Sequence, residues 1–427
     1  MQGLQALLTK TQWLPPEELR RQQAQHLARL LDHAAATVPF YRDRLRPAGA
    51  STDAAAWPHL PVLTRRDLQS AGEAIVSRAV PPDHGDITES RTSGSTGIPV
   101  VVKFTAQATA WFKAIALREQ LWHRRDFAGT FAAIRKYKQG VAMAPDGDRQ
   151  ARWADSAAIP FATGPAMVLN IRTPVAAQVD WLRRIDPDYL MTYPSNLAAL
   201  TEACRDGQLT KLREVITMGE ILPPETRAAV RAAWGVPVHD TYSAKEVGYI
   251  ALQCPEREHL HVQSEVTLVE VLDAAGRPCG PGQVGRVVVT PLHNFAAPLI
   301  RYEIGDFAEV GAPCPCGRGL PVLTRVMGRV RNMLIGPSGR QYWPSFGTSR
   351  FRALAPVRRH QFVQKTADSL EARMVVERPL TADEQEKLKA HILSRLPEPF
   401  TLSFAFVDDI PSSEGGKLEN FICEIAR

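Results

Sequence analysis

The chain has 427 residues, a length that suggests two to three domains and suffices to bury a hydrophobic core. Apolar residues make up 44% and charged residues 22%, which is typical of globular proteins and excludes a disordered or fibrous chain. The net charge is +6, from 51 basic and 45 acidic residues, and no run of five like charges occurs. We therefore expect no nucleic-acid partner, whereas small anionic substrates are compatible with this charge.

Targeting signals are absent from the sequence pattern. Residues 1–10 lack the basic and apolar regions of a signal peptide, and no run of about 18 apolar residues predicts a membrane span. Six cysteines are too few for a disulfide scaffold, so we expect a cytoplasmic protein without a membrane partner. A homodimer is compatible with the sequence.

The first two thirds of the chain alternate helical and extended patterns. Apolar residues at three- and four-residue spacing predict a helix over 27–34, and Thr64 followed by Asp67 predicts the capped start of another. A helix, a strand and a second helix are predicted in this order at 181–185, 189–193 and 196–204. Strands that alternate with helices indicate βαβ units and a largely parallel sheet, so the expected fold class is α/β.

From about residue 266 the pattern becomes rich in strands. Residues 267–272 and 286–290, joined by a Gly/Pro turn, predict an antiparallel hairpin. Strand, strand, helix and strand are then predicted at 361–366, 370–376, 383–396 and 402–406, the helix beginning with a Thr381–Glu384 capping box. We expect a large N-terminal domain over 1–328, with parallel sheets and a β-rich part near 265–325, and a small α+β domain over 329–427.

The strongest local motif is SRTSGSTGIP at residues 90–99, followed by an apolar run. Hydroxyl side chains interleaved with glycines expose backbone N–H groups and add O–H donors, which suits a bound triphosphate. The motif is not a Walker A loop, because the Gly-Lys-Ser/Thr ending is missing. A polar surface turn has a similar composition, so the loop alone leaves both interpretations open. Its candidate phosphate ligands are Thr92, Ser93, Gly94, Ser95, Thr96 and Gly97.

This loop and the segments after it resemble the ordered motifs of adenylate-forming enzymes. The later segments are Gly219-Glu220, YSAKEVG at 242–248, RYEIGD at 301–306, Gly328-Arg329 and GGKL at 415–418. Within that superfamily the chain is most similar to phenylacetate–CoA ligase-like proteins. That similarity is carried by VPFY at 38–41, LPVLTRRDL at 60–68, YPS at 193–195 and CPCGR at 314–318.

The resemblance implies ATP and Mg²⁺ as cofactors and assigns roles to single residues. Glu246 would hold Mg²⁺, which prefers carboxylate and phosphate oxygens. Asp306 would accept hydrogen bonds from the ribose, and Lys417, on a mobile small domain, would place its charge beside the reacting α-phosphate. Each residue also has a purely structural interpretation: Glu246 as an exposed glutamate, Asp306 as a turn aspartate and Lys417 as a surface lysine. The other nucleotide-binding candidates are Gly219, Glu220, Tyr242, Ser243 and Arg329, and the acid-binding candidates are Tyr137, Phe161, Tyr193 and Pro194.

Three departures from the family pattern accompany these matches. Lys245 stands where the family has Thr or Ser, which makes it a third catalytic candidate beside Lys417 and Glu246, and Ser243 replaces a glycine. Ile98 stands where a lysine is common, and the pair at 331–332, Arg-Asn, replaces an acidic pair at the hinge. Lys245 could contact phosphate electrostatically, or it could indicate altered acceptor chemistry.

A second set of residues has the composition of a metal site. Cys254, His261, Cys314 and Cys316 would form a Cys₃His set, a common closed structural zinc site, and some phenylacetate–CoA ligase-like proteins are implied to hold zinc here. His259 is the alternative histidine. Unrelated reduced thiols would show the same spacing, because Cys-x-Cys is less diagnostic than Cys-x-x-Cys.

The predicted function is ATP-dependent activation of a small carboxylic acid, of the aryl or a related class, as an acyl-adenylate. The acyl-adenylate would pass to coenzyme A, the co-substrate that the resemblance favours. Alternatives are transfer to an amine, transfer to a carrier-protein thiol, or a non-catalytic nucleotide-binding protein. Aromatic residues outside the motifs could line a substrate pocket, although helical spacing favours core positions for most of Trp111, Phe112, Trp122, Trp153 and Trp181.

Overall fold

The computed structural model describes residues 2–45, 57–91, 100–153, 162–204, 209–329, 333–344, 346–410 and 420–425. The candidate phosphate ligands at 92–97, together with Ile98, Phe161, Lys417 and the pair at 331–332, therefore lie outside the described residues. For Arg329 the backbone alone is described.

Helices occur along the whole chain. They are α1 (Gln2–Thr11), α2 (Pro16–Thr37), α3 (Tyr41–Arg44), α4 (Arg65–Ala71), α5 (Ala106–Trp122), α6 (Val175–Ile185), α7 (Pro194–Ala203), α8 (Pro224–Trp234), α9 (Phe351–Leu354) and α10 (Ala382–Leu393). Both predicted capping boxes are confirmed: Thr64 Oγ1 accepts from Asp67 N and Thr381 Oγ1 accepts from Glu384 N. The predicted helix to residue 396 ends three residues earlier, at Leu393, shortly before Pro397. None of the described helices combines the length and apolar character needed to cross a bilayer.

The strands of the first three quarters of the chain are short. They are β1 (Ile87–Arg91), β2 (Val101–Thr105), β3 (Phe131–Arg135), β4 (Asp148–Gln150), β5 (Ala166–Asn170), β6 (Tyr189–Thr192), β7 (Glu214–Met218), β8 (Val238–Ala244), β9 (Gly248–Gln253), β10 (Leu260–Val262), β11 (Thr267–Leu272), β12 (Val284–Pro291), β13 (Tyr302–Val310) and β14 (Val322–Arg329). The later strands are β15 (Leu334–Ile335), β16 (Gln341–Tyr342), β17 (Val357–Thr366), β18 (Ser369–Val376), β19 (Thr401–Phe406) and β20 (Phe421–Cys423).

One twelve-stranded sheet organises the larger part of the molecule, in the order β11-β12-β13-β14-β10-β9-β8-β7-β6-β3-β5-β4. Strands β5, β3, β6, β7 and β8 pair in parallel, whereas the pairs from β8 to β11 are antiparallel. The α/β class and the hairpin of β11 and β12 are thus confirmed. The β-rich part continues the parallel sheet instead of forming a sheet of its own, because β9 pairs with β8 along its edge.

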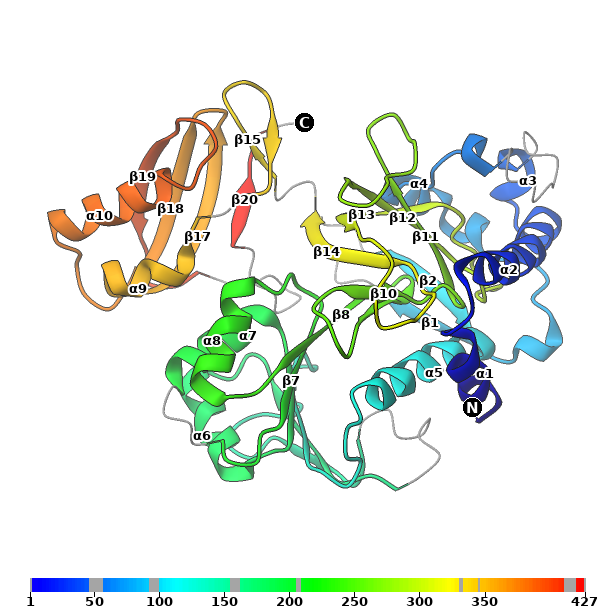
Figure 1. Cartoon of the computed structure of the whole chain (residues 1–427), viewed down its shortest axis with the longest axis horizontal. Coiled ribbons are helices and arrows are strands. Elements are labelled where there is room, and N and C mark those ends of the chain that lie inside the picture. Colours follow the sequence, from blue (N-terminus) through cyan, green and yellow to red (C-terminus); the bar gives the residue numbers. More distant parts are fainter. Residues whose placement is uncertain are drawn as a thin grey trace.

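Helices cover the parallel part of this sheet (Figure 1). α6, α7 and α8 contribute Trp181, Leu197 and Val230 to a core shared with β3, β5, β6, β7 and β8. On the other side, α1 and α5 contribute Leu8 and Ile115 to a core with Leu252 of β9. Helices α6, α7 and α8 thus cover one face of the parallel strands, whereas α1 and α5 pack on β9 in the antiparallel part.

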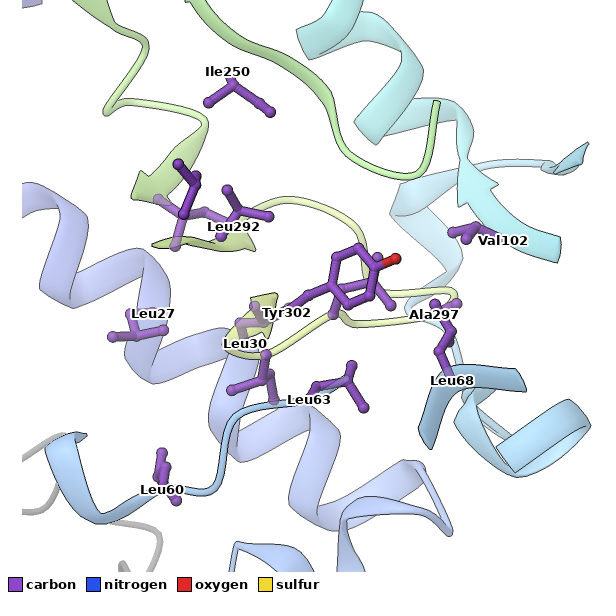
Figure 2. Close-up of a cluster of buried hydrophobic side chains, with 14 of the residues drawn as sticks. Leu27, Leu30, Leu60, Leu63, Leu68, Val102, Ile250, Leu292, Ala297 and Tyr302 are labelled. Carbon is purple, nitrogen blue, oxygen red and sulfur yellow. The ribbon is translucent and has the colours of Figure 1, made fainter. Parts of the chain in front are cut away.

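A third core joins the N-terminal helices to the antiparallel part of the sheet. This cluster contains Leu27 and Leu30 of α2 and Tyr302 of β13 (Figure 2). Leu63, just before α4, belongs to it as well. The neighbouring Arg301 is buried, pairs with Glu270 at 3.0 Å and donates to the carbonyl oxygens of residues 57, 58 and 60. The arginine of the RYEIGD segment therefore fastens the chain before α4 to the sheet.

The C-terminal part has its own four-stranded sheet, in the order β19-β18-β17-β20, and its own core with α9 and α10 (Figure 1). The predicted succession of strand, strand, helix and strand is confirmed, β17 and β18 being antiparallel and β18 and β19 parallel. Phe362 of β17 and Leu388 of α10 are fully buried in this core.

A buried charge network holds the amino ends of β7 and β8. Arg125 Nε donates to Glu214 Oε1 at 3.0 Å, Arg125 also pairs with Glu119 at 2.9 Å, and His239 Nδ1 lies 2.7 Å from Glu214 Oε1. Burial alone would raise the pKa of Glu214, but the contacts of His239 and Arg125 outweigh it and lower that pKa to about 2. The carboxylate is therefore charged in the folded protein at neutral pH.

We expect Glu214→Gln to lower the free energy of unfolding by about 3 kcal/mol at pH 7, because it leaves part of the buried Arg125 charge unmatched. Folding lowers the pKa of Glu214, so its contribution to the free energy of unfolding is complete above about pH 4.5 and decreases as the pH falls toward 2. Urea unfolding at pH 7 and pH 4 measures both effects. The control is Glu309→Gln, which removes a partly exposed pair with Arg325 and should cost below about 1 kcal/mol; equal losses would contradict the prediction.

Candidate active site

The carboxyl ends of the parallel strands bring several predicted residues to one edge of the sheet. Tyr137 follows β3, Tyr193 and Pro194 follow β6, Gly219-Glu220 follows β7, and Lys245-Glu246 follows β8. In open α/β sheets, the crevice outside these strand ends is where ligands bind. Residues separated by more than 100 positions are thus placed in one region because their strands run in the same direction.

Four motif segments meet at this edge and on the strands beside it. Tyr242 Oη of β8 donates to Asp306 Oδ2 of β13 at 2.9 Å, and Asp306 lies opposite Arg329 in the β13–β14 ladder. Gly328 has a φ of +90°, and a Cβ atom there would lie 2.3 Å from the side chain of Ile221, next to Glu220. The backbone conformation therefore favours glycine at 328, and a side chain there would have to displace the end of Ile221.

Glu246 occupies the turn between β8 and β9. Its side chain is only 9% exposed, and Arg65 Nη1 of α4 lies 3.5 Å from Oε1. A carboxylate in this position has the chemistry of a Mg²⁺ ligand, and one ion pair leaves further oxygen lone pairs for a cation. Lys245 beside it is exposed.

Glu220 is held at the start of α7. Its Oε2 accepts from Ser195 N at 2.9 Å, so the acid lies at the positive end of that helix. Tyr193, just before the helix, is mostly buried, and burial raises the pKa of its phenol. Tyr193 Oη accepts from Lys136 N at 3.4 Å, which joins the chain after β6 to that after β3.

The phosphate motif lies between two paired strands. β1 and β2 are antiparallel, and Arg91 pairs with Val101, so the chain enters and leaves residues 92–99 at neighbouring positions. Ser90 lines a cavity that also contacts Lys245. The start of the motif and the turn that carries Glu246 thus face the same space.

That cavity has a volume of about 300 Å³ and mostly apolar walls. Its lining comes from β2, α5, the β8–β9 turn and the segment after β12, and includes Trp111, Phe112, Ile115, Val247, Tyr249 and His293. Helical spacing favours a core position for Phe112, yet its side chain is 39% exposed and stacks on Tyr249 at 4.8 Å. Tyr137, Tyr193 and Pro194 do not line this cavity; the cluster of aromatic residues in α5 was the only sequence signal for it.

The cysteine and histidine candidates converge beside β9 and β10. Cys254 Sγ lies 3.8 Å from Cys314 Sγ, and Cys316 Sγ lies 3.4 Å from His261 Nε2. Possible ligand atoms of Cys254, Cys314, His261 and His259 all lie within 4.8 Å of one another, so both histidines can reach the cluster.

The donors of this cluster suit a metal ion. Burial raises the pKa of the Cys314 thiol to about 12 and lowers that of His261 to about 4. Burial also acts to raise the pKa of Cys316, but hydrogen bonds from Arg318 outweigh it and lower that pKa, which favours the thiolate that a metal ion binds. Cys316 N donates to Cys314 Sγ at 3.4 Å, and His261 Nδ1 faces Leu320 O at 3.4 Å, which leaves Nε2 directed toward Cys316. Such supporting contacts orient the ligands of structural zinc sites.

A mixed sheet with nucleotide-type motifs at its carboxyl edge, followed by a small α+β unit, is the architecture of adenylate-forming enzymes. The family model of AMP-binding enzymes matches residues 19–295, and that of the CapK C-terminal domain matches residues 344–424. The chain therefore belongs to the AMP-binding enzyme family.

Several relatives match most of the chain. It is 25% identical to the phenylacetate-coenzyme A ligase of Thermus thermophilus, with 96% of this chain and 97% of that protein covered. Against the enzyme of the same name from Pseudomonas putida it is also 25% identical, with 77% and 75% covered. A crystal structure of 2-hydroxyisobutyryl-CoA ligase, in the postadenylation state with 2-HIB-AMP, has a TM-score of 0.77 at 19% identity and covers 97% of this chain and 92% of that one.

Proposed function

We propose that this protein activates a carboxylic acid with ATP and transfers the acyl group to coenzyme A. The observation that carries the proposal is the meeting of the 219–221, 242, 306 and 328–329 segments. The β8–β9 turn, which follows residue 242, also lines a cavity together with Ser90. The names of the relatives, phenylacetate-coenzyme A ligase and 2-hydroxyisobutyryl-CoA ligase, support the same reaction.

The reaction has two steps. A carboxylate oxygen attacks the α-phosphorus of ATP, and the bond to the β-phosphate oxygen breaks, giving acyl-AMP and pyrophosphate. The coenzyme A sulfur, having lost its proton, then attacks the acyl carbon, and AMP leaves with its phosphate oxygen. Activation is needed because oxide is a very poor leaving group, whereas AMP is a good one.

Each candidate residue has a separate role in this reaction. Asp306, held by Tyr242, accepts hydrogen bonds from the ribose hydroxyls. Glu246 would hold Mg²⁺, which neutralises phosphate charge when bound. Lys245, exposed and at the edge of the cavity, places a cation beside the acid or the phosphates in place of the hydroxyl common in the family. Lys417 supplies a second cation in the first step.

The cavity beside Lys245 receives the organic group of the acid. Its volume of about 300 Å³ and its aromatic walls, Trp111, Phe112 and Tyr249, suit a small aryl or branched alkyl group. Tyr137, Phe161, Tyr193 and Pro194 remain candidates for the approach to this space from the strand ends.

Pyrophosphate exchange tests the proposal. Protein, ATP, Mg²⁺ and a panel of aryl and alkyl acids are mixed, and acid-dependent exchange is expected for at least one aryl acid. Coenzyme A, or a panel of amines, is then added and the products are identified by mass. Amide products without a coenzyme A thioester would show that the acceptor is an amine. The absence of exchange with every acid would contradict the proposal.

We propose in addition that Cys254, Cys314, Cys316 and His261 hold a structural zinc ion, with His259 as the alternative histidine. The supporting observation is the convergence of thiol and imidazole donors, a set in which four-coordinate zinc is common. Ligand atoms of Cys254, Cys314, His261 and His259 lie within 4.8 Å of one another, and Cys316 Sγ lies 3.4 Å from His261 Nε2. The ion would join the strand after Glu246 to the loop after Asp306. It would thus fix two walls of the nucleotide site without contacting substrate.

We expect about one zinc ion per chain by elemental analysis. Cys314→Ser should remove most of it and lower the melting temperature more than it changes ATP affinity, because the cluster supports the loops from outside the site. Zinc loading should weaken as the pH falls, since the ligands must be deprotonated. The matched control is Cys279→Ser, outside the cluster; metal-free wild type with the same melting temperature as Cys314→Ser would contradict the site.

Division of the chain into a domain over 1–328 and a mobile domain over 329–427 is part of the same proposal. The separate cores and sheets of the two parts support it. Contacts between described residues of the two parts include a hydrogen bond from Thr348 Oγ1 to Glu225 Oε1 at 3.4 Å and the Arg352–Glu202 ion pair. The rings of Phe307 and Trp343, with centroids 5.9 Å apart, add an aromatic contact. Rotation between the two steps would break these contacts and form others.

A further inference from the structure

His293, in the segment after β12, lines the cavity described above. Neighbouring rings contact it from two elements. Its ring stacks on Trp111 of α5, with centroids 4.3 Å apart and planes 11° from parallel. His26 of α2 contacts it edge-on at 4.9 Å, and the side chain is about 9% exposed. A histidine held in this way keeps one orientation toward the cavity that it lines.

The hydrogen bond of this ring decides its tautomer. Nε2 lies 2.9 Å from the backbone oxygen of Glu265, and a carbonyl oxygen can only accept, so Nε2 carries the proton and donates it. Burial lowers the pKa of His293 to about 4, which keeps the ring neutral at physiological pH. Nδ1 is therefore a lone-pair acceptor, and within the described part of the chain it has no hydrogen-bond donor.

Two other polar side chains of the cavity wall, Asn294 and Thr109, are engaged by the backbone. Asn294 Nδ2 donates to Lys103 O at 2.9 Å, and its Oδ1 accepts from Ala296 N at 3.4 Å. Thr109 Oγ1 donates to Thr105 O at 3.1 Å. Lys245 is a cation and can only donate. His293 Nδ1 thus offers an acceptor on a mostly apolar wall, beside the hydroxyl oxygens of Ser90 and Tyr249.

We propose that the preferred acid carries a hydroxyl or amino group, which donates a hydrogen bond to Nδ1 of His293. The inference rests on the proposed acid activation and narrows its substrate class to acids with an apolar body and a hydrogen-bond donor. An acid without the donor would bury Nδ1 unpaired and lose binding energy in the transition state as well as in the ground state.

The experiment compares matched acids by pyrophosphate exchange at saturating ATP. Phenylacetate and benzoate are each tested beside their 3- and 4-hydroxy and 3- and 4-amino derivatives. At least one derivative is expected to exceed its parent acid in kcat/KM by about 10- to 100-fold, the range for one buried hydrogen bond.

Substitutions then assign the preference to His293. His293→Phe keeps a ring against Trp111 but removes the acceptor, and should abolish the preference. His293→Gln can still donate to Glu265 O and offers a carbonyl oxygen, so it should retain part of it and controls for loss of folding. His26→Phe, which touches the ring but does not line the cavity, should leave the preference intact.

Three results would overturn the inference, and the third would also contradict the proposed function. Exchange with the parent acids but no preference for any derivative refutes the role of His293 and leaves acid activation supported. A preference that survives in folded His293→Phe refutes it in the same way. No exchange with any acid contradicts the proposed function and this inference together.

Discussion

Replacing Lys417 by Ala is expected to slow acyl-adenylate formation by about 10²–10³-fold, the range for removing one electrostatic donor from a developing charge. Transfer of the acyl group from preformed adenylate to coenzyme A should change little, because the small domain that carries Lys417 is expected to rotate away between the steps. Pyrophosphate exchange measures the first step. Single-turnover thioester formation from synthetic acyl-adenylate measures the second.

The comparison of the two half-reactions makes this prediction specific. Lys389→Ala, on helix α10 of the same C-terminal part, is the matched control for removing a lysine and should leave both steps unchanged. Equal slowing of both steps in Lys417→Ala would mean that GGKL at 415–418 does not supply the catalytic lysine of the family pattern.

Glu246→Gln is expected to lower pyrophosphate exchange by about 10²–10³-fold and to raise the Mg²⁺ concentration needed for half-maximal rate. The amide keeps the size of the side chain but loses the charge that attracts a divalent cation, which contributes several kcal/mol to stabilising phosphate charge. Exchange rates measured across a Mg²⁺ titration report both effects.

Arg65→Met separates this role from a structural one. Arg65 is the ion-pair partner of Glu246, at 3.5 Å, so its substitution removes the pair but leaves the carboxylate. If Glu246 holds Mg²⁺, Arg65→Met should lose far less activity than Glu246→Gln and keep the wild-type Mg²⁺ dependence. Equal losses with an unchanged Mg²⁺ dependence would assign Glu246 to the ion pair alone.

Local features of the fold were predictable because they depend on side chains within a few residues of one another. The Thr64 and Thr381 caps join positions three apart, and the 267–290 hairpin follows from alternation and a short turn. The boundary at Leu393 was missed because apolar spacing continues to Leu396, while the helix itself ends before Pro397.

The motifs by themselves indicated an adenylate-forming enzyme and named most of the residues at the sheet edge. Their order along the chain was sufficient for the class, since five separate segments rarely recur together by chance. The order of the motifs did not reveal that Arg301 is buried and donates hydrogen bonds to residues 57–60. These contacts involve carbonyl oxygens more than 240 positions away.

Only the tertiary structure reveals the cavity beside Lys245 and the tautomer of His293. The cavity wall combines α5, the β8–β9 turn and the segment after β12, which packing brings together from positions up to about 200 apart. The proton position on His293 depends on one carbonyl oxygen, that of Glu265, which no local pattern predicts. Composition and motif order therefore determined the class of chemistry, whereas the shape and polarity of the cavity proposed to receive the acid arise from contacts between distant segments.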